Sequence, residues 1–228
     1  MKLIAVETST DACSAALFID GDIREKFAIA PREHTKLILP MIDELMAEAQ
    51  LVPSQLDAVA LSRGPGSFTG IRIATGVAHG IALGVDVPVA LVSTLASMAQ
   101  ALFNRDEQAN LAYTALDARM SEIFWGIYRR DSLGLAELLD EETVIPPSNV
   151  SCCQQPGHGI GSGWRTYREC LLARLAPWVQ SIDDEVWPRA ACIAQLGAYQ
   201  YAQGRAVAVE QAMPVYLRDK VAKKSAER

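Results

Sequence analysis

The residues best suited to chemistry lie in a glycine-rich segment, residues 63–72, whose sequence is RGPGSFTGIR. An apolar run at 58–61 precedes this segment and a long apolar stretch follows it, so the pattern predicts a strand, a turn and a helix. The first backbone N–H groups of a helix are free to bind an anion. The same glycines could instead supply only the geometry of a tight crossover. The turn alone does not separate a phosphate site from a structural turn.

A second polar loop, Glu7-Thr8-Ser9-Thr10, ends the first apolar run of the chain. Its hydroxyl groups could contact a phosphate and Glu7 could contact a magnesium ion, or the loop could be a polar hairpin turn closed by a carboxylate. It lacks a glycine through which backbone could approach a phosphate. Gly161-Ser162-Gly163 could be the corresponding loop later in the chain, but no paired-glycine adenosine signature follows it.

Metal and nucleophilic chemistry have less support. The three histidines are far apart and no two have the i, i+4 spacing that places two imidazoles on one metal: His34, His79 and His158. We therefore predict capping or packing roles for His34 and His79, with no metal and no cofactor. Ser67 is not in a G-x-S-x-G motif and has no evident base, so a hydrolase nucleophile is not predicted. Cys152 and Cys153 have no basic neighbour and are predicted to be inert.

Composition limits the classes of protein that this chain can join. Its 228 residues carry a net charge of −6, which argues against a stand-alone nucleic-acid binder. Residues 218–228 are nevertheless basic, as in a tail that aids solubility or docks a partner. No signal peptide, membrane-spanning apolar run or C-x-x-C spacing is present, so we expect a cytoplasmic protein with reduced cysteines.

The first half of the chain has the pattern β-β-β-α-β-α-β-α. Three antiparallel strands followed by α/β alternation form the ribonuclease-H-like arrangement, and Asp20-Gly21-Asp22 is a strong hairpin signal between two of those strands. The predicted elements are strands at 2–7, 13–19, 23–29, 58–62 and 87–92, with helices at 34–50, at 69–83 ended by Gly84, and from Ser93 or Thr94 to about Phe103.

The second half repeats this opening in weaker form. The apolar run 111–116 meets Asp117 much as the run 3–6 meets Glu7, and strands at 122–128 and 133–139 follow. The pattern then fades. Residues 146–163 have loop composition, and only two helices are predicted after them, at 166–175 and 190–204.

We therefore predict an α/β fold of two ribonuclease-H-like lobes, 1–105 and 106–228, the second degenerate and carrying the basic tail. A duplication of this kind is the plan of the actin-like ATPase (ASKHA) superfamily, whose members bind ATP between the lobes. This is an analogy of fold and not evidence of activity.

The predicted helix 69–83 is apolar on nearly every side. A helix of this kind is buried on nearly all sides, so one face should pack on the chain's own sheet and another on a partner. Its polar residues form one narrow stripe: Arg72, Thr75 and His79. Three glycines one turn apart would let a partner helix approach closely: Gly76, Gly80 and Gly84.

Six segments, in the family's order from end to end, resemble the bacterial TsaB (YeaZ) family. They are residues 4–14 (IAVETSTDACS), 32–35 (REHT), 64–72 (GPGSFTGIR), 117–120 (DARM), 161–164 (GSGW) and 214–218 (PVYLR). The glycine-rich segment also occurs in TsaD relatives, whereas the others point to TsaB. The family more often has aspartate where this chain has Glu7, which weakens a metal or nucleotide role there.

The resemblance implies a role in making threonylcarbamoyladenosine at position 37 of tRNAs that read codons beginning with A. In that pathway a TsaC-type enzyme makes threonylcarbamoyl-adenylate, the metal-bearing TsaD transfers the threonylcarbamoyl group, and TsaE is the associated ATPase. The implied role is that of a non-catalytic subunit that binds and activates the TsaD-type transferase with TsaE, meets tRNA only through the complex, and can form a homodimer.

The resemblance also implies that one surface, on helices 69–83 and 34–50 of the first lobe, serves both the partner and the homodimer. The expected contact residues are Arg63, Pro65, Phe68, Ile71, Arg72, Thr75, Gly76, His79, Gly80 and Leu83. Glu7, Thr8, Ser9 and Thr10 remain a possible vestige of a nucleotide site. The alternative is an enzyme of the same superfamily, either an ATP-dependent phosphotransferase or a glycoprotease-like peptidase, which would need a nucleotide or metal site.

Overall fold

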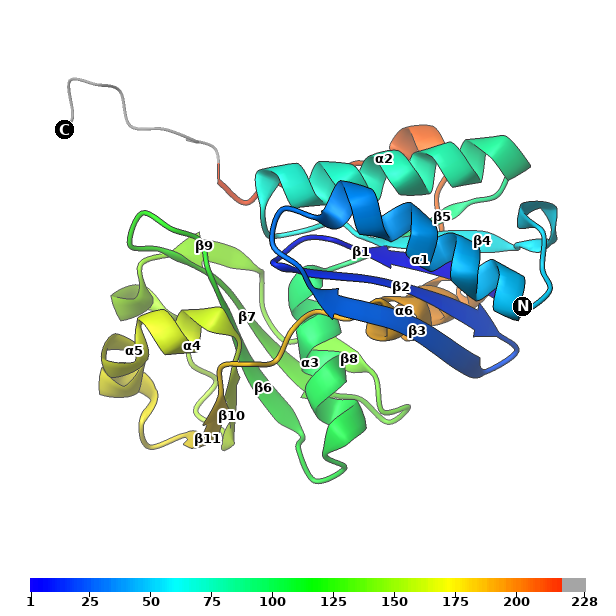
Figure 1. Ribbon diagram of the computed structural model, residues 1–228. Coiled ribbons are helices and arrows are strands. Elements are labelled where there is room, and N and C mark those ends of the chain that lie inside the picture. The colour runs from blue at the N-terminus through cyan, green and yellow to red at the C-terminus, as the bar shows by residue number, and fades with distance from the viewer. Residues whose placement is uncertain (219–228) are drawn as a thin grey trace, which may run out of the picture.

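The computed structural model describes residues 1–218 as an α/β protein built on two mixed sheets (Figure 1). The first sheet has the order β3-β2-β1-β4-β5. Its antiparallel part and its parallel part meet at β1, as the sequence predicts. Its strands are β1 (Lys2–Glu7), β2 (Ala12–Ile19), β3 (Asp22–Ile29), β4 (Ala58–Ser62) and β5 (Val89–Val92).

The second sheet repeats this topology. Its order is β11-β10-β6-β7-β8, so β6 is central, with an antiparallel partner on one side and two parallel strands on the other. Its strands are β6 (Leu111–Asp117), β7 (Ile123–Arg130), β8 (Ala136–Leu138), β10 (Gly157–Ile160) and β11 (Val179–Asp183), and β9 (Thr143–Ile145) also pairs with β7. The predicted duplication is confirmed.

The prediction that residues 146–163 are only a loop was wrong, because β10 lies within them between β6 and β11. Local composition misled here, since glycine is depleted in strands. Packing explains the glycines: a methyl group at Gly159 would lie 2.5 Å from the Trp164 ring, and one at Gly157 would lie 2.8 Å from Leu111. The strand is therefore glycine-rich because large neighbours lie directly against it.

The degeneracy predicted for the second lobe is found in its helices. Where the first half has the fifteen-residue helix α1 (His34–Glu48), the second has only the short turn η2 (Pro147–Asn149). Where the first half has α2 (Phe68–Val85), the second has α4 (Ser162–Thr166) and α5 (Arg168–Leu175). The remaining short turns are η1 (Pro53–Gln55) and η3 (Val209–Gln211).

The two halves of the chain exchange helices. In Figure 1, α1 and α2 cover one face of the first sheet and α6 (Ala190–Ala202) lies on its other face, whereas α3 (Thr94–Arg105) packs on β6, β7 and β8 of the second sheet. Helix α6 packs very close to the first sheet at Gly197, where a methyl group would lie 2.6 Å from the Ala60 side chain. The boundary between residues 105 and 106 stays a prediction, and each half supplies a helix to the other's sheet.

Helix α2 is longer than predicted. Gly84 lies inside it, and Asp86 ends it in the left-handed conformation, where its N–H bonds to the Ala82 carbonyl. Within residues 1–218, α2 is the one helix long and apolar enough to cross a membrane, although only 28% of that window is buried. Core helices of water-soluble folds pass the same test, and Ile71, Ala74 and Ala78 pack α2 onto the first sheet.

Candidate functional sites

Loop 8–11, which follows β1, is held against the start of α2. The Thr8 hydroxyl donates to the Gly70 carbonyl at 2.7 Å, the Ser67 N–H donates to the Ser9 carbonyl at 2.7 Å, and the Thr94 hydroxyl donates to the Ser9 hydroxyl at 3.1 Å. Thr8 and Ser9 are fully buried. These polar groups of the loop therefore form hydrogen bonds within the protein.

The glycines of the turn before α2 have a packing role. A methyl group at Gly66 would lie 2.4 Å from the Ser9 carbonyl oxygen, and one at Gly70 would lie 2.0 Å from the Thr8 carbonyl oxygen. The Ser67 hydroxyl caps the helix by accepting from the Gly70 N–H at 3.3 Å. Carbonyl oxygens of loop 8–11 thus lie where the sequence suggested a phosphate. A vestigial nucleotide contact by Glu7, Thr8, Ser9 and Thr10 stays a prediction.

The Glu7 carboxyl is fully buried at the end of β1. Its Oε1 accepts from the Ser9 N–H at 2.5 Å, whereas Oε2 and the nearby Ser62 hydroxyl are buried without a hydrogen-bond partner. Desolvation by burial raises the pKa of Glu7, against weaker lowering by hydrogen bonding with Ser9. Burial thus favours the neutral form of this carboxyl over the charged form.

Loop 118–121, which follows β6, is more exposed than loop 8–11. Arg119, Met120 and Ser121 all have left-handed backbone, with φ of 60°, 57° and 61°. Such a run is rare without glycine, because each residue pays a steric cost of about 1 kcal/mol. The Arg119 side chain is 85% exposed, and Met120 is exposed beside it.

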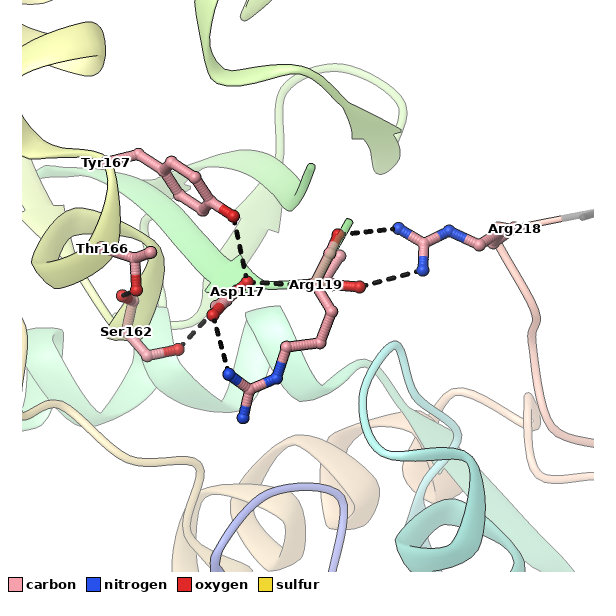
Figure 2. A network of polar contacts seen from close by, with 7 residues as sticks. Asp117, Arg119, Ser162, Thr166, Tyr167 and Arg218 are labelled. Atoms are coloured by element: carbon pink, nitrogen blue, oxygen red, sulfur yellow. Dashed lines mark hydrogen bonds and ion pairs between the residues drawn. The ribbon is translucent and has the colours of Figure 1, made fainter. Parts of the chain in front are cut away.

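Polar contacts from three segments hold this loop (Figure 2). The Asp117 carboxylate accepts from the Arg119 N–H at 2.8 Å and from the Tyr167 hydroxyl at 3.4 Å. The Asp117 N–H donates to the Ser162 hydroxyl at 3.2 Å. Arg218 donates to the carbonyls of Ala118 and Arg119, at 2.9 and 3.3 Å, and pairs with Glu122 at 2.5 Å. A residue near the C-terminus therefore fixes a loop one hundred residues earlier in the chain.

The predicted partner residues divide into three groups. Pro65 and Ile71 are buried in the fold, and Arg63 is partly buried, with an ion pair to Glu142 at 3.7 Å. Thr75 and His79 are half-buried and bond to the carbonyls of Ile71 and Ala212, at 2.9 and 2.7 Å. The residues at the surface are Phe68, Arg72, Gly76, Gly80 and Leu83.

The C-terminal segment adds residues to this face that the sequence pattern did not indicate. It lies along α2, with the Val215 N–H donating to the Arg63 carbonyl at 2.9 Å. The Tyr216 and Phe68 rings lie 6.0 Å apart, and the Arg72 guanidinium lies 3.3 Å from the Phe68 ring centre. Met213 is also exposed. Only the PVYLR segment of the resemblance drew attention to this region.

A cleft between the lobes is lined by charged and apolar groups. It has a volume of about 430 Å³ and is bordered by Arg63, Tyr128, Tyr199 and Arg205. The buried Glu142 carboxylate accepts from the hydroxyls of Ser93 and Tyr128 beside this cleft. Burial, followed by the Glu142 charge, raises the pKa of Tyr128. These contacts tie the two lobes together.

The histidines bond to neighbouring groups. His34 Nε2 lies 2.8 Å from the Thr10 carbonyl, and His158 Nδ1 lies 2.8 Å from the Ser181 hydroxyl. Among residues 1–218, no group of three or more His, Cys, Asp or Glu side chains is placed to hold a metal ion. The five cysteines are free thiols.

Comparisons with known proteins fit this architecture. Residues 28–158 match the family model of TsaD, tRNA N6-adenosine threonylcarbamoyltransferase. The chain is 39% identical to the tRNA threonylcarbamoyladenosine biosynthesis protein TsaB of Escherichia coli (strain K12), over 97% of this chain and 96% of that protein.

Two solved structures from Pseudomonas aeruginosa are also similar. YeaZ has a TM-score of 0.87 and 37% identity, over 95% of this chain and 99% of that one. A protein described as uncharacterized, with similarity to peptidase YEAZ, has a TM-score of 0.88 and 39% identity over the same shares.

The paired sheets with matching strand order define a duplicated ribonuclease-H-like α/β protein. Sequence identity over nearly the full length is more specific, and the chain belongs to the TsaB (YeaZ) family.

Proposed function

We propose that this chain takes part in tRNA threonylcarbamoyladenosine biosynthesis as a non-catalytic, cytoplasmic subunit that binds and activates a TsaD-type transferase together with a TsaE-type ATPase. Family membership supports the pathway, since the E. coli relative is named a tRNA threonylcarbamoyladenosine biosynthesis protein. The observation that carries the subunit role is the exposed face of α2, where Phe68 and Leu83 are 53% and 63% exposed.

The shape of this face suits a helix of the partner. A methyl group at Gly76, Gly80 or Gly84 would meet nothing within 4 Å, so the glycines form an open strip on α2, which also exposes Phe68 and Leu83. Glycines on a helix surface let a second helix pack at short distance. Such a surface is complementary to a ridge of side chains on a partner helix, and a second copy of the chain could use it in a homodimer.

The environment of Glu7 supports a non-catalytic role. The Glu7 carboxyl is fully buried, and loop 8–11 packs against the start of α2. In the proposed complex the transferase carries out the chemistry, and tRNA binds through the assembled complex.

A pull-down with the TsaD-type partner tests this proposal. Gly80→Leu places a large side chain in the glycine strip and should abolish capture of the transferase while the variant stays folded. Ala173→Leu is the control, because it places the same leucine side chain at an exposed position of α5 on the second lobe. Unchanged capture by Gly80→Leu would reject the proposed surface. Equal loss in both variants would mean that added bulk has a general effect.

The enzymatic alternative has one observation in its favour, the description of a similar structure as resembling a peptidase. Calorimetry of the isolated chain with Mg-ATP and with zinc tests it. Stoichiometric binding of either would favour a phosphotransferase or a peptidase. The proposed role predicts no tight binding.

A further inference from the structure

Two adjacent cysteines lie in the loop between η2 and β10, residues 150–156. Cys152 and Cys153 are half-buried free thiols that pack against the apolar core of the second sheet. The sequence predicts inert thiols there because no basic residue is near, but a charge pattern does not show where the two sulfurs point. The structure places both sulfurs at one oxygen atom.

That oxygen is the hydroxyl of Tyr113 on β6. Tyr113 Oη lies 3.7 Å from the Cys152 sulfur and 3.4 Å from the Cys153 sulfur. The hydroxyl donates its own proton to the Gln155 carbonyl at 2.7 Å, so its oxygen is left to accept from the two S–H groups. The Tyr113 side chain is buried and its ring stacks on Trp125 at 6.0 Å, which holds this oxygen in place.

The backbone of the loop turns directly after the pair. In an extended chain, the side chains of adjacent residues point in opposite directions. Here Gln154 has left-handed backbone, with φ of 56°, and its N–H donates to the Cys152 sulfur at 3.3 Å. The two sulfurs are therefore gathered at the Tyr113 hydroxyl before any bond joins them.

We propose that Cys152 and Cys153, gathered at the Tyr113 hydroxyl, are a site of reversible oxidation at which hydrogen peroxide converts the two thiols into a disulfide. In the first step one sulfur, as its thiolate, attacks a peroxide oxygen, which gives a sulfenic acid and releases water. In the second step the other sulfur attacks the sulfenic sulfur, the S–S bond forms and a second water leaves. The cysteines are oxidised, the peroxide is reduced, and the site is independent of the proposed function.

A disulfide between adjacent residues is easily reduced again. Adjacent Cα atoms are about 3.8 Å apart, whereas the Cα atoms of most disulfides are about 4.4–6.8 Å apart. Strained disulfides are more reducible than relaxed ones and belong to the labile, regulatory kind. Disulfides in a reducing cytoplasm are of this transient kind. The oxidised pair is therefore a reversible modification of the second lobe and not a structural cross-link.

The other cysteines are poorer sites for this chemistry. Desolvation by burial raises the pKa of Cys13 to about 11 and the pKa of Cys192 to about 12, so both carry little thiolate at neutral pH. Cys170 is half-buried, but no cysteine adjoins it in sequence to resolve a sulfenic acid. The second sulfur is what distinguishes the pair.

Peptide mapping of the oxidised full chain tests the proposal. The reduced protein is treated with one equivalent of hydrogen peroxide, the remaining thiols are blocked with a maleimide, and the chain is cut after lysine and arginine. The pair then lies in peptide 131–165 and Cys170 lies in peptide 169–174. We expect peptide 131–165 to lose the mass of two hydrogens and to carry no maleimide, while peptide 169–174 keeps its label. Reduced glutathione, added before the blocking step, should restore both labels on the pair.

Variants separate the pair from its surroundings. Cys152→Ser and Cys153→Ser each leave one sulfur without a resolving partner, so their peptide should gain oxygen and not lose hydrogen. Tyr113→Phe keeps the ring and removes the hydroxyl, and it should slow the loss of two hydrogens about tenfold, because the sulfurs are no longer held at one oxygen. Cys170→Ser and Tyr167→Phe are the matched controls in the same lobe and should react as the unmodified chain does.

Three results would overturn the proposal. Peptide 131–165 of the unmodified chain could keep both labels or gain oxygen, which would show that the second sulfur does not resolve the first. Cys170 could lose its label as fast as the pair, which would show general oxidation of accessible thiols. Tyr113→Phe could react at an unchanged rate, which would show that the hydroxyl does not prepare the pair. None of these results bears on capture of the transferase, so the proposed function stands or falls separately.

Discussion

Loops 8–11 and 118–121 occupy equivalent positions in the two sheets and have different structures. Each follows the central strand of its sheet and comes directly after an acidic residue, Glu7 or Asp117. The first loop is packed under α2 and Glu7 is fully buried, whereas the second presents Arg119 to solvent. The duplication of the sheets therefore does not fix the environment of the loop that follows β1 or β6.

The neighbouring glycine turn accounts for the difference. In the first lobe, Gly66 and Gly70 let the start of α2 reach the carbonyls of Ser9 and Thr8. In the second lobe, the glycines lie against the strand instead, since a methyl group at Gly163 would lie 2.7 Å from the Ala115 side chain. Loop 118–121 is thus left uncovered, and Arg218 holds it in place.

The most direct way to break this comparison is Gly70→Ala. The added methyl group would collide with the Thr8 carbonyl, and neither backbone segment can move freely, so we expect a loss of about 3 kcal/mol or more in unfolding free energy. Gly76→Ala is the matched control in the same helix, where the methyl group meets nothing within 4 Å. It should stabilise the chain by up to about 1 kcal/mol, through helix propensity. Denaturant unfolding measures both, and a loss below about 1 kcal/mol for Gly70→Ala would show that loop 8–11 yields easily.

A smaller effect is expected from Glu7→Gln. The raised pKa means that the folded state holds its proton more tightly than the unfolded state does, so the stability of the unmodified chain falls as pH rises above about 4.5. Glutamine removes this dependence, keeps the acceptor for the Ser9 N–H and adds a donor for Ser62.

The variant should therefore be more stable than the unmodified chain by about 1 kcal/mol at neutral pH. The difference in stability between the two proteins should shrink as the pH falls below about 4.5, because Glu7 is then protonated in both the folded and the unfolded state. Thermal unfolding between pH 4 and 8 measures it. Parallel stability curves for the two proteins would show that Glu7 is ionised and compensated in the folded state.

The smallest effect concerns the strain in loop 118–121. Ser121→Gly removes the steric cost of a left-handed backbone, and we expect a net gain of about 0.5 kcal/mol after the entropy of glycine is included. Ser132→Gly, at an exposed position after β7 with ordinary backbone, should cost a few tenths of a kcal/mol. Chemical unfolding compares the two. Destabilisation by Ser121→Gly as large as that by Ser132→Gly would argue that the loop is not strained.

Much of the fold could be predicted from local sequence patterns. The strands of the first sheet, the hairpin at Asp20 and Gly21, and the helix capped by Ser93 all have local signals, and each is present. Strands β10 and β11 were missed because β10 is rich in glycine and β11 is partly exposed, so neither has a clear apolar pattern. The second sheet therefore matches the first more fully than the apolar periodicity of the sequence indicated.

The candidate sites were less predictable than the fold. The exposed face of α2 could be predicted, because its apolar residues exceed what one sheet can cover. Tyr216 could not be placed there by spacing, since it lies far from α2 in sequence and reaches Phe68 because Val215 bonds to Arg63 beside it. Nor does a glycine turn reveal which oxygen it approaches, because a phosphate and a carbonyl both accept from the same N–H groups.

The sequence by itself determined the first sheet, the antiparallel start of the second, the turn before α2 and the apolar excess of that helix, because each follows from local periodicity and turn chemistry. Only the tertiary structure decided that α3 and α6 are exchanged between the sheets, that loop 8–11 fills the turn, and that Arg218 holds loop 118–121 open. These features depend on contacts between residues far apart in the chain, where packing and hydrogen-bond satisfaction select among arrangements that local patterns allow equally.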